Sequence, residues 1–395
     1  MFFAWIVLPL LAVVLTAVFL YWKIYKGIQY FTGIRLKRGM QRLAAAAGMA
    51  VLVLPAFRFY GTWFLVLLHF AVFLLLGELV FWIYDRIRKG KERPKAMQVL
   101  YKSGICAVVL TAAVISYGFY NMYHVRETEY TVETGKTIQK EGYRMAVVSD
   151  LHYGISLNGE QLQEAVSRIE AENPDFVILD GDIVDERTTR EEMEEAFSIL
   201  GSMTSKYGIF YVYGNHDKNA YTTTPNYTAE ELAETIRHSG ITILEDDTVE
   251  INGELLLIGR GDKGERNGRK EISELTEGQD PEKFWIILDH QPAEYAKVQQ
   301  AGGGLIVSGH THAGQIWPLG LFASLFHLDD MNYGYRQMDT MQALVTSGIA
   351  GWGFPIRTEK HCEYLIVNVV PETSAFVRQL PVFLSWKGEE KQSRR

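Results

Sequence analysis

Cysteine is scarce in this sequence, because only Cys106 and Cys362 occur among 395 residues. One of the two falls inside an apolar run, so a disulfide framework and a cysteine-based zinc cluster are both excluded. We interpret both cysteines as structural residues. A folded part without disulfides must be stabilised by its own core, and about 250 residues are sufficient for that.

Acidic residues are nearly missing from the first third of the chain. Residues 1–126 contain 15 Lys or Arg against three Asp or Glu, a net charge of +12, whereas the whole chain has −8 and the remainder therefore −20. An acidic remainder argues against a nucleic-acid partner, since nucleic-acid binding depends on basic side chains that neutralise phosphates. An anionic substrate would instead need local positive charge, such as bound metal.

Charge of either sign is nearly absent from four long apolar runs in the same third, where Glu78 is the one charged residue. Four segments, at 2–22, 43–57, 62–84 and 103–120, have the length or composition of membrane spans. A cleaved signal peptide is the alternative for the first segment, but no basic region precedes it. His69 and Glu78 lie within the third segment and are candidates for a functional role there.

Basic residues between these segments predict the orientation in the membrane. They gather at 23–42 and 86–102, whereas Arg58 is nearly alone in the middle loop. Because cytoplasmic loops are enriched in Lys and Arg, both basic loops are expected inside the cell. We therefore predict a multi-pass cell-membrane protein whose part after residue 120 is extracytoplasmic, with membrane lipids among its partners.

The sequence divides into four regions by composition. We expect a transmembrane helical domain at 1–122, a linker with one short strand at 123–143, an α/β domain at 144–380 and a polar tail at 381–395. Apolar, β-branched runs predict strands, and periodic apolar stripes predict helices at 159–171, 189–203 and 228–239. The strands are expected at 144–149, 176–179, 209–213, 241–244, 255–259, 284–288, 305–307, 343–346 and 364–369.

The segment Gly-His-Thr-His-Ala-Gly-Gln at 309–315 follows one of these strands. Residues two apart on extended backbone face the same way, so His310 and His312 can point to one site. Four further loops offer oxygen or imidazole groups where a predicted strand ends. They are Asp150-Leu-His152, Gly181-Asp182-Ile-Val-Asp185, Gly214-Asn215-His216-Asp217 and Asp289-His290.

These five blocks resemble the calcineurin-like metallophosphoesterases, and the continuation Gly-Gln-Ile-x-x-Pro is similar to their membrane-associated bacterial branch. The resemblance covers about residues 145–315. It implies a four-layer αββα sandwich that holds two divalent metal ions, Mn, Fe or Zn, at the strand ends. The helical membrane domain is not part of the resemblance.

Carried over by position, the resemblance implies two sets of metal ligands. Asp150, His152, Asp182 and His312 would hold one ion, and Asp182, Asn215, His290 and His310 the other, with Asp182 shared. Two ions so held would lower the pKa of a bridging water, whose hydroxide attacks phosphorus in line.

Two residues are expected to be catalytic rather than metal-binding. His216 resembles the family's catalytic histidine, and Asp217 is expected to orient it, with a capping role as the alternative. Asp185 is either an outer partner of the site or a turn residue.

The segment after the last block is rich in apolar and aromatic residues from 316 to 338. It is either core packing or an apolar rim that suits a lipid substrate. Arg357, in the Gly-rich stretch 348–357, either approaches a phosphate or lies in solvent.

The function expected from these observations is hydrolysis of a phosphodiester, pyrophosphate or phosphomonoester, on a small molecule, a lipid or an envelope precursor. A nucleotide–lipid pyrophosphate is one option, although that substrate is cytoplasmic in the related enzymes and the charge rule points outward. The rival function is a non-catalytic membrane sensor or scaffold that binds a phosphorylated ligand. Such a protein would be expected to have lost a ligand or His216, and none is lost.

Overall fold

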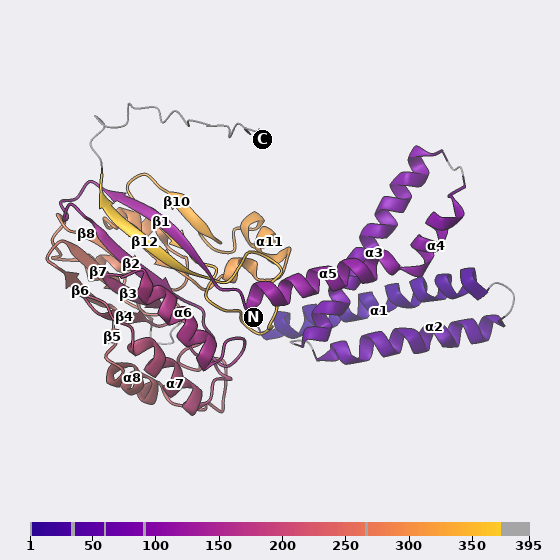
Figure 1. Cartoon of the computed structure of the whole chain (residues 1–395), viewed down its shortest axis with the longest axis horizontal. Coiled ribbons are helices and arrows are strands. Elements are labelled where there is room, and N and C mark those ends of the chain that lie inside the picture. The colour runs from indigo at the N-terminus through magenta and orange to yellow at the C-terminus, as the bar shows by residue number, and fades with distance from the viewer. Residues whose placement is uncertain (1, 33–35, 59–60, 90–91, 265–267, 373–395) are drawn as a thin grey trace, which may run out of the picture.

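The computed structural model describes residues 2–32, 36–58, 61–89, 92–264 and 268–372. The expected domain end at 380 and the expected tail at 381–395 lie outside these residues. In Figure 1 the described chain begins with a bundle of helices and continues into two packed sheets.

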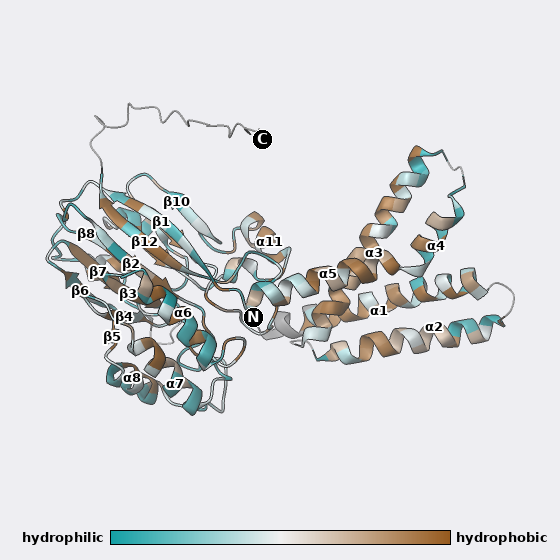
Figure 2. Cartoon of the chain, viewed as in Figure 1, coloured by the Kyte–Doolittle hydropathy of each residue, from teal (hydrophilic) through white to brown (hydrophobic). Residues whose placement is uncertain are grey.

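The first helices confirm the four apolar segments expected from the sequence. Stretches long and apolar enough to cross a membrane are Pro9–Thr32, Arg38–Phe57, Thr62–Ile87 and Ile105–Met122, and they are mostly brown in Figure 2. The helices are α1 (Phe2–Thr32), α2 (Arg38–Val53) with the short 3-10 turn η2 (Leu54–Phe57), α3 (Thr62–Ile87), α4 (Lys95–Ser103) and α5 (Ile105–Met122).

Helix α1 continues ten residues past its expected end at residue 22. Lys23 does not end the helix, because its Nζ lies 2.6 Å from Glu78 Oε1 of α3 and its charge is compensated. The start of α1 and the end of α5 both lie beside the sheets, and the end of α1, the start of α2 and the end of α3 lie at the far end of the bundle (Figure 1).

The rest of the chain forms two six-stranded sheets. Sheet A has the order β1 (Arg126–Thr134), β12 (Glu363–Pro371), β2 (Tyr143–Val148), β3 (Phe176–Asp180), β4 (Ile209–Val212), β5 (Thr242–Ile243). Sheet B has the order β10 (Gly334–Gln337), β11 (Gln342–Val345), β9 (Leu305–Ser308), β8 (Phe284–Leu288), β7 (Leu255–Gly259), β6 (Asp247–Ile251).

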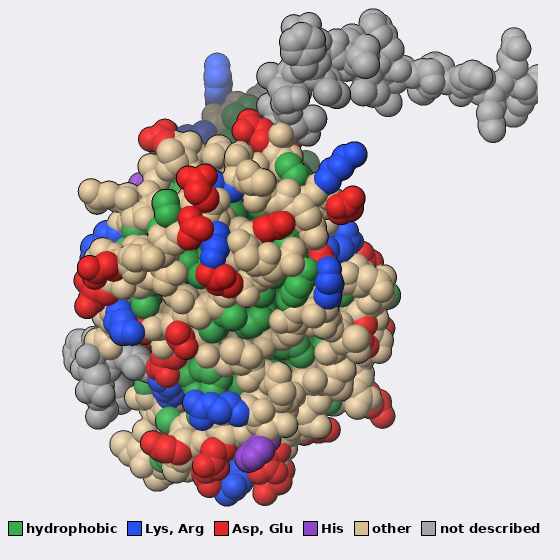
Figure 3. Space-filling view, turned by 90° about the vertical axis from the view of Figure 1, so that its left-hand side faces the viewer, with side chains coloured by type: hydrophobic (Ala, Val, Ile, Leu, Met, Phe, Trp, Pro, Cys, Tyr) green, Lys and Arg blue, Asp and Glu red, His purple; other side chains and the backbone are tan. Residues whose placement is uncertain are grey.

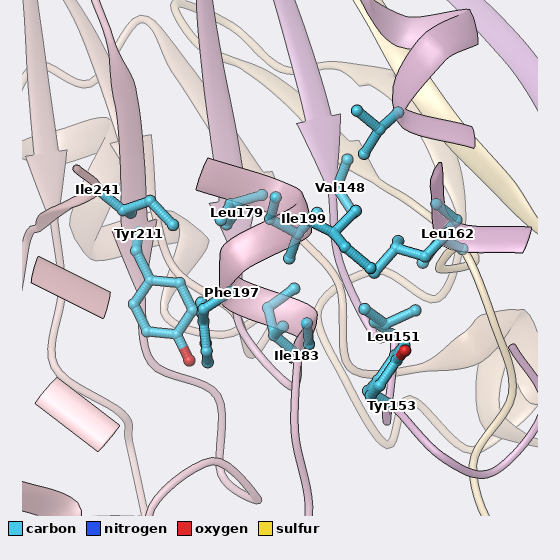
Figure 4. Packing of buried hydrophobic residues seen from close by; sticks show 14 of the residues in the cluster. Val148, Leu151, Tyr153, Leu162, Leu179, Ile183, Phe197, Ile199, Tyr211 and Ile241 are labelled. Carbon is cyan, nitrogen blue, oxygen red and sulfur yellow. The ribbon is translucent and has the colours of Figure 1, made fainter. Parts of the chain in front are cut away.

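Alternation along the strands produces the layers. In β2, Met145 and Val147 point into the core between the sheets, and Ala146 and Val148 point to the helices on the other face. That face of sheet A is covered by α6 (Gly159–Ala171), α7 (Arg190–Gly201) and α8 (Ala229–His238). Figure 4 shows side chains of this layer, with Phe197 of α7 close to Tyr211 of β4.

The outer face of sheet B is covered by α9 (Ile272–Thr276) and α10 (Tyr295–Gln300). The four-layer αββα sandwich expected from the sequence is thereby confirmed. Two short elements follow β9, the turn η3 (His312–Gly314) and α11 (Leu319–Leu325). Viewed from the end away from the helices, the sandwich carries charged side chains of both signs, interspersed (Figure 3).

The residues expected to form a linker, 123–143, contain a nine-residue strand. β1 pairs in parallel with β12 at the edge of sheet A, from Arg126 opposite Glu363 to Thr134 opposite Pro371. Val132 is fully buried between the sheets. Only three residues separate the end of α5 from the start of β1, so this helix continues almost directly into the sandwich.

Candidate metal centre

The sheet topology brings the five predicted blocks to one edge. β2, β3 and β4 are parallel neighbours in sheet A, and β8 and β9 are parallel neighbours in sheet B. Because parallel strands end at the same edge, the loops that follow them meet there. All seven expected ligands lie in these loops: Asp150, His152, Asp182, Asn215, His290, His310 and His312.

Three of them form a first group that could hold a metal ion. The ligand atoms of Asp150, His152 and His312 lie within 4.8 Å of one another, and all three residues are buried. The Nε2 atoms of the two histidines are 3.2 Å apart, and His312 Nε2 is 3.5 Å from Asp150 Oδ1. Buried carboxylate and imidazole groups converging on one point are a suitable donor set for a divalent cation.

A second group consists of Asp182, His290 and His310, whose ligand atoms also lie within 4.8 Å of one another. His290 Nε2 is 3.1 Å from Asp182 Oδ2. Asn215 lies in the neighbouring loop, and its buried Oδ1 has no hydrogen-bond partner among the described residues. An unpaired buried acceptor is costly, and a cation would satisfy it.

Asp182 stands between the two groups. The same oxygen that approaches His290 lies 3.7 Å from His152 Nε2 of the first group. Its other oxygen accepts a hydrogen bond of 2.9 Å from the backbone N–H of His216. One carboxylate is therefore placed where it could serve both ion positions.

Backbone strain is concentrated in the same loops. Five of the expected ligands have φ between 41° and 69°, a region that residues other than glycine rarely adopt. These are Asp150, His152, Asp182, His310 and His312. Strain of this kind is typical of sites that fix functional side chains at a cost in stability.

Glycine before His310 allows the two sheets to approach. A Cβ atom at Gly309 would lie 2.0 Å from Ser149 Oγ and 2.4 Å from Asp150 Oδ2. Because Gly309 leaves this space free, the backbone N–H of His310 donates to both oxygens of Asp150, at 3.0 and 3.1 Å. The glycine thus fixes the position of a carboxylate from the opposite sheet.

The electrostatics of the centre favour a cation near Asp182 and neutral imidazoles beside it. Burial, assisted by the charge of His290, lowers the pKa of His310 to about 3. Burial opposes a charge on His290 as well, but Asp182 outweighs it and raises the pKa of His290 well above its usual value. Positive charge is therefore stabilised next to Asp182, while His310 offers a free lone pair.

The orientation of His290 is set by the backbone. Its Nδ1 lies 2.7 Å from the carbonyl oxygen of Asp180, which can only accept, so Nδ1 carries the proton. Nε2 then faces Asp182 and the second group. Such a bond to the distal nitrogen commonly orients metal-binding histidines.

His216 lies beside both groups without belonging to either. Its Nδ1 is 2.9 Å from Glu186 Oε2, and its ring lies 5.5 Å from that of Trp352 and 5.0 Å from that of Tyr221. Burial lowers the pKa of His216, but Asp182 and the hydrogen bond to Glu186 outweigh it and raise the value to about 9. His216 is therefore held as a proton donor.

The expectation that Asp217 orients His216 is wrong. Both carboxylate oxygens of Asp217 accept hydrogen bonds from the backbone N–H groups of Asp182, Ile183, Val184 and Gly214, at 2.6 to 3.2 Å. Asp217 clamps the two loops that carry Asp182 and Asn215, close to the capping role that was the alternative. The partner of His216 is Glu186.

Asp185 combines the two roles left open for it. Its Oδ2 lies 3.6 Å from His152 Nδ1, on the side of the ring away from Asp182, and its Oδ1 accepts from the backbone N–H of Arg187 at 2.7 Å. It therefore closes a turn and places negative charge behind a proposed ligand.

Arg357 fits neither expectation. It is fully buried, so it does not lie in solvent. Its guanidinium donates to the carbonyl oxygens of His312 and Ala350, at 2.9 and 2.6 Å, rather than pointing to an open phosphate site. It fixes the backbone of the His312 loop from behind.

Several residues of the centre were missed in the sequence. Glu186 follows Asp185 directly, but nothing in its spacing separates it from a solvated residue. Asp180 is fully buried. Burial raises the pKa of its carboxyl well above the usual value; the charge of His290 opposes this shift, and nearby carboxylates add to it. Arg260 and Arg269 both pair with Asp289, at 2.9 and 2.8 Å, and brace the His290 loop.

Comparison with known proteins agrees with this geometry. Residues 143–314 match the calcineurin-like phosphoesterase family. The chain carries a calcineurin-like metallophosphoesterase domain. Over 325 residues it is 29% identical to a transmembrane protein with metallophosphoesterase domain from Danio rerio, covering 76% of this chain and 70% of that protein.

A metallophosphoesterase of Helicobacter pylori is 28% identical over 236 residues, which are 59% of this chain. The chain spans 61% of that relative's length. Among solved structures, a dimetal phosphatase from Danio rerio aligns with a TM-score of 0.37 and 13% identity, over 53% of this chain and 88% of that one.

Proposed function

We propose that the protein is a membrane-anchored, dinuclear-metal phosphohydrolase acting on a phosphodiester, pyrophosphate or phosphomonoester. The observation that supports this most is the position of Asp182 Oδ2, 3.7 Å from His152 and 3.1 Å from His290, between two ligand groups. Divalent ions held there, Mn, Fe or Zn by the mixed imidazole and carboxylate donors, would supply Lewis acidity and a water of lowered pKa.

Each residue of the centre has a proposed role. Asp150, His152 and His312 hold one ion and Asn215, His290 and His310 the other, with Asp182 shared. His216 donates a proton from Nε2 to the leaving oxygen, because Glu186 occupies Nδ1. Asp217 keeps the Asp182 and Asn215 loops in register, and Arg357 does the same for the His312 loop.

We further propose that the helices span the cell membrane and that the metallophosphoesterase domain is extracytoplasmic. The start of α1 and the end of α5 lie on the side of the sandwich, and the end of α1, the start of α2 and the end of α3, where basic residues gather, lie at the other end of the bundle (Figure 1). The enrichment of Lys and Arg in cytoplasmic loops supports this orientation. A reporter enzyme fused after Tyr130 should be active only outside the cytoplasm, and activity inside would reverse the orientation.

The hydrolase proposal is tested with purified full-length protein. After chelation, adding Mn²⁺ should restore hydrolysis of bis(p-nitrophenyl) phosphate or p-nitrophenyl phosphate, and the preferred ester defines the reaction class. Asp182→Asn, prepared in the same way, is the control that separates the protein's activity from a contaminant. Metal binding without turnover of either ester would contradict the proposal and favour a binding protein.

A further inference from the structure

The metal centre faces the membrane helices. Three residues separate the end of α5 from Arg126, where β1 begins, and β1 runs parallel to β12. β2 runs antiparallel to β12, so its end, where Asp150 follows, lies at the edge from which α5 leaves the sandwich. The ligand loops are thus on the membrane side of the domain, as the arrangement of the two parts in Figure 1 shows.

Direct contacts join α5 to the ligand loops at this edge. The backbone N–H of Arg357 donates to the carbonyl oxygen of Gly118 at 3.0 Å, and Asn121 Nδ2 donates to the carbonyl of Arg357 at 3.1 Å. The side chain of Arg357 in turn holds the carbonyl of His312. A single residue therefore separates the membrane helix from a proposed metal ligand.

An apolar surface extends from the same loops. No Lys, Arg, Asp or Glu occurs from 313 to 328, yet large apolar side chains of this stretch are exposed. They are Trp317, Leu319, Leu321, Phe322, Leu325, Phe326 and Leu328, each between 46 and 69% exposed. We call these seven residues the α11 patch. An apolar patch of this size on a folded domain marks a contact surface, which disfavours the core-packing alternative for these residues.

The helices that are long and apolar enough to span a membrane adjoin this surface. Ile316, directly before the patch, and Ile356 belong to one buried cluster with Leu65 and Ile115 of the membrane helices. The first turn of α11 is hydrogen-bonded to the segment that follows Ile356, because the backbone N–H of Gly320 donates to Glu359 Oε2 at 2.9 Å. Along the bundle axis, α11 lies level with the last turns of α5 (Figure 2).

Exposed aromatic side chains occur on the helices at the end of the bundle that is next to α11. Tyr117, Tyr120 and Tyr123 at the end of α5 are 42 to 54% exposed, and Trp63 at the start of α3 is 41% exposed. Aromatic residues of this kind gather where the hydrocarbon meets the head groups. Trp317 of the α11 patch extends this belt onto the metallophosphoesterase domain.

A cleft opens between the two parts beside the metal centre. Its volume is about 550 Å³, and Arg58 and Trp63 line it from the bundle, while Ile155, Arg187 and Gly353 line it from the sandwich. Ile155 is three residues from His152, and Gly353 is next to Trp352, whose ring contacts that of His216. The charged residues that line it are Arg58, Arg187 and Glu192, so the cleft has a net positive charge that suits an anionic head group.

We propose that the α11 patch inserts into the leaflet next to the domain, and that the substrate is a phosphate ester on the head group of a membrane lipid. The apolar patch anchors the domain, and the cleft receives the head group from the same leaflet. This inference rests on the proposed hydrolase function for its substrate, whereas the membrane contact of the patch is independent of it.

The membrane contact is tested by depth-dependent quenching. Full-length protein carrying Cys106→Ala and a fluorophore on Leu325→Cys is reconstituted into phosphatidylcholine vesicles with or without brominated acyl chains. Brominated lipid should quench the label at Leu325. A label on Glu282→Cys, an exposed residue just before β8 at the opposite edge, should stay unquenched. Equal intensity at Leu325 in both lipids would overturn the insertion.

The substrate class is tested with a matched pair of esters, methyl p-nitrophenyl phosphate and dodecyl p-nitrophenyl phosphate in vesicles. Wild type should prefer the dodecyl ester in kcat/KM. Changing Leu321, Phe322, Leu325 and Phe326 to Ser should lower this preference at least about tenfold, since apolar burial in the bilayer is lost. The same four residues changed to Met should preserve it, because Met keeps the apolar surface.

The outcomes separate this inference from the function on which it rests. If wild type hydrolyses neither these two diesters nor p-nitrophenyl phosphate, the hydrolase function and the lipid substrate both fail, while the quenching still decides the membrane contact. If both esters are hydrolysed equally well and the Ser variant changes nothing, only the lipid substrate fails. Loss of both activities together with bound metal in the Ser variant, but not in the Met variant, would show that the patch is core and overturn the inference.

Discussion

The apolar helices at the start of the chain and the metallophosphoesterase domain bury polar groups in different ways. In the helices, Lys23 Nζ lies 2.6 Å from Glu78 Oε1, and His69 Nδ1 lies 2.8 Å from the carbonyl of Leu65 in its own helix. At the edge of the sandwich, Asp150 and Asp182 are contacted by imidazoles and backbone N–H groups. Glu78 is paired with a lysine, whereas Asp150 and Asp182 have imidazoles but no Lys or Arg as ion-pair partners among the described residues.

The sandwich also contains a site where charges are fully paired, which shows that the difference is local. Arg260 and Arg269 both pair with Asp289 and Glu294, at 2.8 to 2.9 Å. Only one residue further along the chain, His290 faces Asp182. Charges that stabilise the fold are thus paired with arginine, and carboxylates surrounded by imidazoles mark the place where a metal ion is expected.

The largest effect is expected for Asp182→Asn, because both proposed ion positions lose the shared carboxylate. Bound metal should fall together with activity, and hydrolysis should decrease by at least about 10³-fold, more than the 10–100-fold typical of outer partners. Metal content by elemental analysis and rate on an aryl phosphate ester are measured on one preparation. Retention of both metals with full activity would show that the carboxylate does not bridge.

A second prediction separates the proton donor from the ligands. His216→Ala should keep its metal and lose rate by about 10²–10⁴-fold, the range of positioned acids and bases. Glu186→Gln should have a smaller effect in the same direction, since Glu186 only holds Nδ1. Asp217→Asn serves as the contrast, because its loss should loosen the loops and lower metal binding as well as rate. A metal-free His216→Ala protein would reassign His216 as a ligand.

The sequence predicted the parts of the molecule that depend on local pattern. Apolar, β-branched runs at 144–149 and 305–307 identified buried strands, and the polar residues directly after them identified the ligand loops, since parallel strands end at one edge. Long, nearly uncharged apolar segments identified the helices of the first third of the chain. The residues carried over from the resemblance lie together in the structure, with Asn215 beside the second group.

Contacts between distant segments could not be predicted in the same way. Glu186 meets His216 across 30 residues, and Arg357 meets His312 across 45 residues. Neither pair has a periodic spacing, and each depends on how loops fold over the sheet edge. The prediction for Asp217 failed because this carboxylate, although next to His216 in sequence, accepts hydrogen bonds from backbone N–H groups instead of from the His216 ring.

The third prediction tests the paired charges of the sandwich. Arg260 is almost fully buried, so Arg260→Met should leave Asp289 partly unpaired and lower the free energy of unfolding by about 3–5 kcal/mol, as is usual when one member of a buried pair is removed. Chemical unfolding of metal-free protein measures this loss. A change below about 1 kcal/mol would mean that Arg269 alone satisfies Asp289.

The same cluster has a defined pH dependence. Burial raises the pKa of Glu294, but Lys297, Arg269 and Arg260 outweigh it and lower the value to about 2 from 4.5. A depressed carboxylate pKa contributes stability that is present above the unfolded value and lost as pH falls through the folded one. The effect of Glu294→Gln should therefore be full above about pH 4.5 and vanish towards pH 2.

The smallest effect is expected from the charges of the membrane helices. Lys23 and Glu78 are paired, and Tyr101 also donates to Glu78, so the structure gives Glu78 a partner rather than an open position. A double-mutant cycle of Lys23→Met and Glu78→Gln should show a coupling of about 0.6–1.7 kcal/mol, the range for polar contacts between membrane helices. Unfolding in mixed detergent micelles measures this coupling.

Hydrolysis of a soluble ester should stay within about twofold in all three variants of the cycle, because the pair is remote from the ligand loops and near the water at the far end of the bundle. A loss of rate comparable to that of His216→Ala, with metal retained, would contradict the comparison. It would mean that the helices and the centre are coupled and that Glu78 is functional after all.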